Sequence, residues 1–212
     1  MTEQEWLACT DPTPMLEFLK GKASDRKLRL LGCGCCRRVW SILPDYPTRR
    51  IVEVVERFVE GQESSPTVGR LRKQATRADT RYLHPYNLAV RKPTVQSTER
   101  VLIGAARFVA WEEEWGIREE RRQAESAAQT FLLRDIFGNP FRPVAADPRW
   151  LTSTAVALAR AIYDDRAFDR LPILADALED AGCDNADILS HLRGDGPHVR
   201  GCWALDLVLG KE

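Results

Sequence analysis

The chain has 212 residues, of which 44% are hydrophobic and 29% charged, and its 31 Lys and Arg residues balance its 31 Asp and Glu residues. This composition is typical of globular domains, and zero net charge argues against a surface that is electropositive throughout. No apolar run approaches the ~20 residues needed to cross a bilayer. The first residues, MTEQEW, lack the basic start and apolar run of a signal segment. We therefore expect a soluble, cytoplasmic protein without a membrane partner.

Apolar residues recur every three to four positions along most of the chain, which predicts an all-α, compact multi-helix bundle with short loops. The β-branched run 51–59 would also suit a strand, but its interleaved charges favour an amphipathic helix that ends at Gly61. A last helix is expected over 198–209. Residues with the chemistry of helix N-caps precede the apolar patterns: Thr2, which makes a capping box with Glu5, Thr13, Ser24, Ser97, Thr152 or Ser153, and Asn185.

Prolines divide the pattern in its second half. The segment NPFRPVAADPRW, residues 139–150, contains three prolines and cannot form regular structure. Its aromatic residues predict an ordered crossing over the surface rather than a loose linker. We expect either a single helical domain over 1–212 or two packed lobes, 1–93 and 94–212.

The six cysteines allow three interpretations. Cys33, Cys35 and Cys36 lie in the apolar run LLGCGCCRRVW, where free cysteine behaves as a small hydrophobic residue. The same residues could form a structural metal site with Cys183, His191, His198 or Cys202, because thiolate and imidazole are the ligands of zinc. His198 and Cys202 would share one face of the expected last helix. The third interpretation is a reactive thiol at Cys36, because two arginines follow it.

The stretch 66–93 is strongly basic and contains tyrosines. Arg70, Lys73, Arg77 and Arg81 fall on or near one stripe of a helix. Such a stripe can contact phosphates, and tyrosines can stack on bases. The acid-rich block 112–125 offers an alternative, in which the arginines pair within the protein.

No catalytic signature is present, and we predict no catalytic residue. Arg134, Asp135, Arg142 and Arg149 form the most groove-like collection of polar residues. His191 and His198, with Cys183 or Cys202, contain the residue types of a nucleophile and its base. However, no cysteine or serine stands in a known nucleophile motif.

Two blocks resemble a large group of uncharacterised bacterial proteins. The first begins TEQEWLACTDPTPMLEFL and ends CCRRVW, and the second contains LLRDIFGNPFRPV and HVRGCW. The resemblance implies no activity, cofactor or catalytic residue. From the helical pattern and the balanced charge we expect a non-catalytic protein–protein interaction or adaptor module. The alternatives are nucleic-acid binding through 66–93 and a metal or redox site around Cys33, Cys35 and Cys36.

Overall fold

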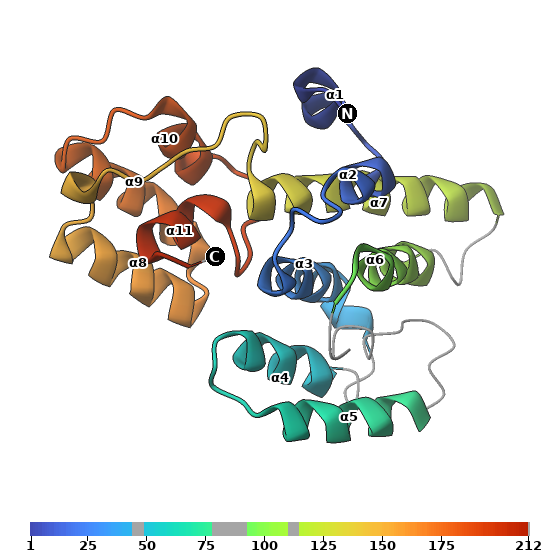
Figure 1. Ribbon diagram of the computed structural model, residues 1–212. Helices are drawn as coiled ribbons and strands as arrows, with labels where there is room; N and C mark the ends of the chain where they lie inside the picture. The colour runs from blue at the N-terminus through green and yellow to red at the C-terminus, as the bar shows by residue number, and fades with distance from the viewer. Residues whose placement is uncertain (44–48, 78–92, 110–114, 212) are drawn as a thin grey trace. The chain divides into compact units, whose positions relative to one another are not determined.

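A computed structural model describes residues 1–43, 49–77, 93–109 and 115–211. These residues form α-helices joined by short 3-10 helices and loops, and no strand occurs in the ranges described (Figure 1). The predicted all-α, multi-helix fold is confirmed. No helix of the described ranges is long and apolar enough to span a bilayer.

The chain divides into two units, Met1–Leu133 and Arg134–Glu212. The division lies inside α7 and not at the predicted boundary between residues 93 and 94. The reason is that α6 contacts α2 and α3, which places it in the first unit. The helices that begin in this unit are α1 (Glu3–Ala8), α2 (Pro12–Phe18), α3 (Asp25–Arg38), η1 (Trp40–Ile42), α4 (Arg50–Val59), α5 (Ser65–Arg77), α6 (Val95–Val109) and α7 (Trp115–Phe137).

Local sequence signals explain where several of these helices begin. Thr2 and Glu5 form the predicted capping box, and the Ser24 hydroxyl accepts a hydrogen bond from the Lys27 backbone N–H. The predicted cap at Thr13 is wrong, because Asp11 caps α2 and its carboxylate accepts a hydrogen bond from the backbone N–H of Thr13.

The start of α6 was also predicted too late. Thr94 and Ser97 cap its N-terminus reciprocally: each side-chain oxygen accepts a hydrogen bond from the other residue's backbone N–H. Thr94 is therefore the cap, and Ser97 is the third residue of the helix that follows it. The error arose because both residues are good caps, and only the position of the first helical turn distinguishes them.

The middle of α3 is the centre of the first unit and packs against α4 and α6. The helix continues through Gly32 and Gly34, both buried, so a break at these glycines is excluded. On α4 the apolar residues of 51–55 are buried, and the predicted helix over 51–59 is confirmed.

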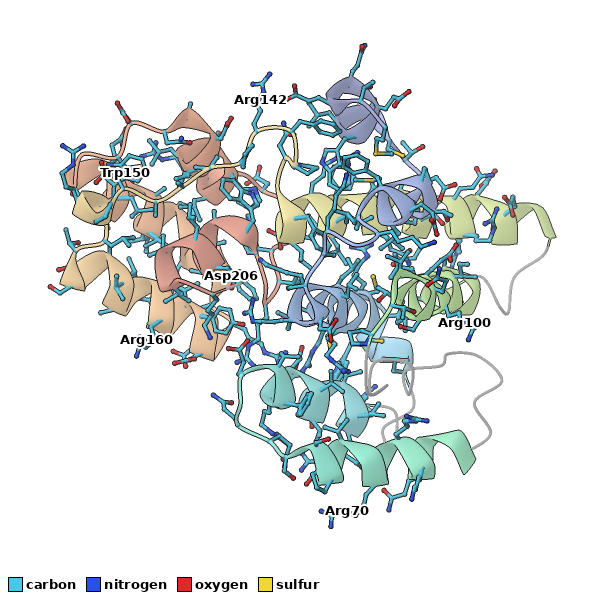
Figure 2. The ribbon with its side chains drawn as sticks, viewed as in Figure 1. Arg70, Arg100, Arg142, Trp150, Arg160 and Asp206 are labelled. Carbon is cyan, nitrogen blue, oxygen red and sulfur yellow. The ribbon has the colours of Figure 1, made fainter. Side chains whose placement is uncertain are left out.

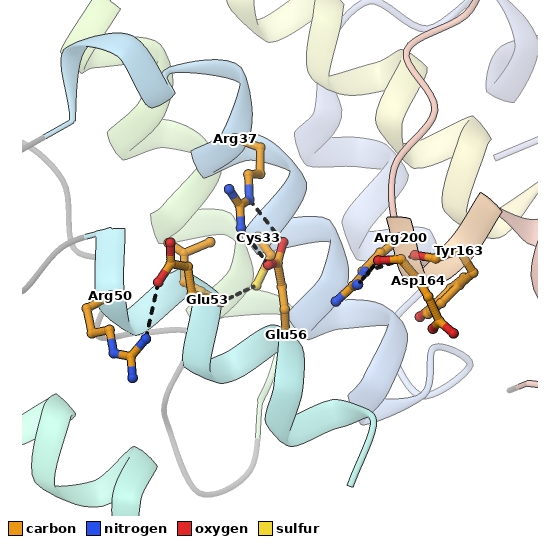
Figure 3. A network of polar contacts seen from close by, with 9 residues as sticks. Cys33, Arg37, Arg50, Glu53, Glu56, Tyr163, Asp164 and Arg200 are labelled. Carbon is orange, nitrogen blue, oxygen red and sulfur yellow. Dashed lines mark hydrogen bonds and ion pairs between the residues drawn. The ribbon is translucent and has the colours of Figure 1, made fainter. Parts of the chain in front are cut away.

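Buried carboxylates of the first unit are paired with arginines of α3. The Arg37 guanidinium donates two hydrogen bonds to Glu56, at 3.2 and 2.7 Å (Figure 3). Arg38 donates to both carboxylate oxygens of Glu125 on α7. These pairs compensate for the cost of removing Glu56 and Glu125 from water.

The second unit contains the end of α7, η4 (Pro148–Trp150), α8 (Ser153–Asp165), η5 (Phe168–Arg170), α9 (Leu171–Asp180), α10 (Ala186–Arg193) and α11 (Trp203–Leu209). Its core joins α8, α9, α10 and α11 around fully buried residues such as Ile162, Leu174, Leu192 and Leu205. Of the two predicted caps for α8, Thr152 is the one observed, with a hydrogen bond from Ala155, and the predicted cap at Asn185 is confirmed by a hydrogen bond from Ile188.

The segment 139–150 is irregular up to η4, as its prolines predict. Val144 and Trp150 are half-buried and pack against the core of the second unit. The crossing is therefore anchored by its apolar side chains.

The predicted helix over 198–209 is wrong in its first half. Residues 198–201 form no helix, Gly201 has a φ of 94°, and α11 starts only at Trp203. A residue with positive φ interrupts helical geometry. Cys202 is consequently the residue directly before α11.

Candidate metal centre

Four potential metal ligands meet in the second unit: Asp135, His191, His198 and Cys202. Asp135 lies in the last turn of α7, His191 in α10, His198 in the loop that follows α10, and Cys202 just before α11. One ligand atom from each residue lies within 4.8 Å of the other three. It is the one group of three or more such ligands found among the described residues.

The interatomic distances define a small cluster. Asp135 Oδ1 lies 2.8 Å from His198 Nδ1 and 3.2 Å from His191 Nε2. Cys202 Sγ lies 3.2 Å from His191 Nε2 and 3.9 Å from His198 Nδ1. All four side chains thus direct a ligand atom towards one point.

These distances match a tetrahedral zinc site. Zinc–nitrogen and zinc–oxygen bonds of ~2.0–2.1 Å and a zinc–sulfur bond of ~2.3 Å place tetrahedral ligand atoms about 3.3–3.6 Å apart. The four measured separations, 2.8, 3.2, 3.2 and 3.9 Å, lie on both sides of this range. To bind a tetrahedral ion, each of these four separations would need to change by about half an ångström or less.

Asp135 needs a positive partner. Its carboxylate is 4% exposed and lies at the C-terminal end of a helix, where the helix dipole disfavours a negative charge. Its Oδ2 accepts a hydrogen bond of 3.0 Å from the backbone N–H of Val199. Burial acts to raise the pKa of Asp135, but hydrogen bonds from His191 and His198, with their charges, lower it below its ordinary value. The Asp135 side chain is therefore ionised.

His198 has an oxygen acceptor at each ring nitrogen. Nδ1 faces Asp135, and Nε2 lies 3.2 Å from the carbonyl oxygen of Gly194. Burial acts to lower the pKa of His198, but the hydrogen bond and charge of Asp135, with the Gly194 carbonyl, raise it overall. The two oxygen acceptors and the raised pKa both favour the imidazolium form of His198 when no metal is bound. With metal at Nδ1, the Nε2–H still donates to Gly194, an arrangement that commonly orients metal-bound histidine.

Cys202 is fully buried, and its thiol is not a free nucleophile. Burial, followed by the negative charge of Asp135, raises the pKa of the Cys202 thiol well above its ordinary range. The backbone N–H groups of Leu205 and Ala204 act in the opposite direction. A divalent cation bound at Sγ would remove the proton, because a coordinated thiol is deprotonated.

Trp203 forms one wall of the cluster. Its ring lies 5.1 Å from the His191 ring, and the His191 and His198 rings meet edge to face at 5.0 Å. A side chain at Gly138 would contact the Trp203 ring at 3.1 Å. The chain turns sharply at Gly138, which has a φ of 62°, and this turn leaves room for the indole.

The structure places the cysteines of α3 elsewhere. Cys33, Cys35 and Cys36 belong to the first unit, are at most 1% exposed, and take no part in the ligand group described above. Burial raises the pKa of Cys36 to about 12 despite the opposing charge of Arg37. The predicted reactive thiol at Cys36 is therefore wrong, because the residue is not exposed.

The basic stretch lies partly outside the described residues. Arg70 and Lys73 are exposed on α5, where Figure 2 shows Arg70 extending away from the helix. For Arg77 only the backbone is described, as the last residue of α5, and Arg81 lies outside the described residues.

Sequence reasoning named all four residues of the cluster but did not join them. It placed Asp135 with the arginines of 134–149 and assigned His198 and Cys202 to one helix face. His191 was considered as a possible zinc ligand for the cysteines of 33–36 and as a base for a cysteine, but not together with Asp135. The missing signal is tertiary, since Asp135 and His198 are 63 positions apart in sequence.

Comparisons of the chain with models of known protein families, with curated proteins and with solved structures find no match.

Proposed function

We propose that the chain is a non-catalytic helical interaction module whose second unit is stabilised by a bound divalent transition metal, with zinc as the best fit. The observation that carries the proposal is the convergence of four ligand atoms from Asp135, His191, His198 and Cys202. They bring together the end of α7, α10 and the start of α11, so one ion would connect three helices.

Charge balance supports a divalent ion. A carboxylate at Asp135 and a thiolate at Cys202 supply two negative charges, and two neutral imidazoles complete the set. Without metal, the Asp135 carboxylate is balanced by the imidazolium of His198. The site is therefore electrically neutral both with and without the metal. Because an uncompensated charge is costly in a largely buried site, we expect protons to replace the metal when it leaves.

A structural role fits better than a catalytic one. A catalytic zinc ion usually keeps one coordination position for water, whereas structural sites use four protein ligands. Here four protein ligands surround the point, and both Asp135 and Cys202 are at most 4% exposed. Mixed carboxylate, imidazole and thiolate ligands in tetrahedral geometry favour zinc over Ca²⁺ and Mg²⁺, which take oxygen ligands.

Metal analysis tests this function directly. We expect protein purified through a tag without histidine to contain about one zinc ion per chain by elemental analysis. Replacement with Co²⁺ should give the visible absorption of a tetrahedral ion with one thiolate ligand. Both signals should be lost in Asp135→Asn and Cys202→Ser.

Cys183→Ser is the matched control. Cys183 is also a buried cysteine of the second unit, 3% exposed, but it lies in the apolar core and not in the ligand group. It should retain the metal. A wild-type chain that contains no metal, and whose thermal unfolding does not respond to added zinc, would show that the cluster is only a hydrogen-bond network.

The interaction role and a cytoplasmic location belong to the same proposal. All six cysteines are free, five of them buried, which is the usual state of cysteine in a reducing compartment. The role would also agree with the resemblance to bacterial proteins without a known activity. Affinity purification of wild type and of Cys202→Ser in parallel tests whether partner capture depends on the metal-bound unit.

A second candidate function is nucleic-acid binding through α5. It is favoured by Arg70 and Lys73, which are both exposed on this helix. Binding should weaken as salt increases, because phosphate contacts release counterions. Arg70→Glu with Lys73→Glu should abolish the shift of a labelled RNA or DNA at low salt, whereas Arg50→Glu on α4 should not. No shift with the wild-type chain excludes this candidate.

A further inference from the structure

A groove of about 770 Å³ opens in the first unit, apart from the metal centre. Its walls come from three segments: residues 10–16 around the start of α2, one face of α6, and the middle of α7. This volume is within the range of small-molecule sites. We refer to it as the α2–α6–α7 groove.

A buried hydrogen-bond acceptor without a partner lines the groove. Gln129 of α7 is fully buried, and its Nε2 donates to the carbonyl oxygen of Leu102 at 3.0 Å. Its Oε1 has no hydrogen-bond partner among the described residues. Turning the amide over would place Oε1 against the Leu102 oxygen, so the observed orientation is fixed. The groove thus offers an acceptor to a ligand that carries an N–H or O–H donor.

The charges of the groove favour a cation. Asp11, Glu99 and Glu120 line it, against one cationic side chain, Arg122. The Arg122 guanidinium already donates hydrogen bonds to both carboxylate oxygens of Glu119. Glu99 and Glu120 have no ion pair within the described part of the chain. The uncompensated charge at the groove is therefore negative.

The remaining wall is apolar. Leu16 and Leu102 are buried, while Ile103 is 40% exposed, so part of its aliphatic side chain is open to a ligand. A ligand that fits all three features has an aliphatic chain, a positive charge and an N–H donor. We propose that the α2–α6–α7 groove binds a linear aliphatic amine of the polyamine class, with one ammonium group donating to Gln129 Oε1 and a second near Glu99 or Glu120.

Nuclear magnetic resonance with spermidine tests the proposal on the full chain. The two side-chain amide protons of Gln129 should shift with added spermidine, at millimolar concentration or below. Two further probes separate the contributions of charge and hydrogen bonding. Tetramethylammonium carries the charge without a hydrogen-bond donor, and 1,5-pentanediol carries donors without the charge. Both should bind more weakly than spermidine, and equal binding of either would overturn the proposal.

Substitutions identify the residues responsible. Glu99→Gln and Glu120→Gln should each weaken spermidine binding about two- to fivefold, as expected for charges that water partly screens. Glu17→Gln is the matched control, because Glu17 lies on α2 outside the groove and pairs with Lys20. Gln129→Leu should abolish binding. If that variant does not fold, the Glu99 and Glu120 variants remain decisive, and binding that is unchanged in both would refute the proposal.

Discussion

Asp135 and His198 are joined by a contact of 2.8 Å between Oδ1 and Nδ1, although 63 residues separate them. The contact links the last turn of α7 to the loop before α11. In the protein without metal it is an ion pair, and with metal the same two atoms would become ligands. This pair therefore determines how the second unit responds to both protons and zinc.

We expect the stability of the second unit to change with pH in opposite directions in the metal-free and the zinc-bound protein. The pKa of His198 is raised, so the stability it contributes is fully present below its unfolded value of ~6.5 and is lost as the pH rises through its folded pKa. The pKa of Asp135 is lowered, so its contribution is lost only as the pH falls below ~4 towards its folded pKa. Without metal, stability should be greatest between these limits.

With zinc the trend should reverse, because the metal competes with protons for His198 and Cys202. Urea unfolding at pH 5.5 and pH 8, with either a chelator or zinc, checks both signs. In chelator the unfolding midpoint should fall at the higher pH, and in zinc it should rise. A midpoint that changes in the same direction in both series would contradict the proposed exchange.

The Arg37–Glu56 pair should be asymmetric to substitution. The Glu56 side chain is 4% exposed, whereas that of Arg37 is 26% exposed. Arg37→Met removes the guanidinium group that donates two hydrogen bonds to this buried carboxylate and should cost about 3 kcal/mol. Glu56→Gln leaves Arg37 able to reach water and should cost less. Arg50→Met breaks the exposed pair with Glu53 on the same helix, and its cost should stay below about 1 kcal/mol. Urea unfolding of the three variants gives the comparison.

Thiol labelling should distinguish Cys9 from the other cysteines. Cys9 is half-buried, while the other five are buried. Burial raises the pKa of Cys36 to about 12 and raises the pKa of Cys35, so neither forms a thiolate at neutral pH. Ellman's reagent should label about one thiol per native chain and all of them in denaturant. Rapid native labelling of a cysteine of α3, located by mass spectrometry, would restore the redox interpretation.

Gly138→Ala should destabilise the second unit and weaken zinc binding. Gly138 has a φ of 62°, and a Cβ atom there would lie 3.1 Å from the Trp203 ring, which in turn packs on His191. Gly182→Ala is the control, because Gly182 also has a positive φ, 89°, but open space around it. Both variants carry backbone strain of about 1 kcal/mol. Only Gly138→Ala should also change the zinc affinity and the Trp203 fluorescence.

Most features that depend on neighbours in sequence were predicted correctly, apart from the caps at Thr13 and Ser97. The capping box of Thr2 and Glu5, the cap at Ser24 and the helix over 51–59 all follow from contacts within one or two turns. The prediction failed where a backbone angle decided the outcome, as at Gly201, whose φ of 94° ends the expected helix before Cys202.

The metal centre could not be predicted as a set. Its ligands come from a helix end, a helix interior, a loop and a cap position, so no fixed spacing connects them. The cysteines with the most suggestive spacing, 33, 35 and 36, lie instead in the interior of α3. Apolar periodicity explains their burial, whereas the meeting of Asp135 with His191 depends on how the second unit folds.

The division between the two units falls between Leu133 and Arg134, close to the C-terminal end of a continuous helix. Anyone who dissects the gene at this point would leave Asp135 as the second residue of the shorter product. The new N-terminus would fray, and the Asp135 carboxylate would no longer be held next to His191 and His198. A fragment intended to retain the metal must therefore start several turns upstream, well inside the preceding unit.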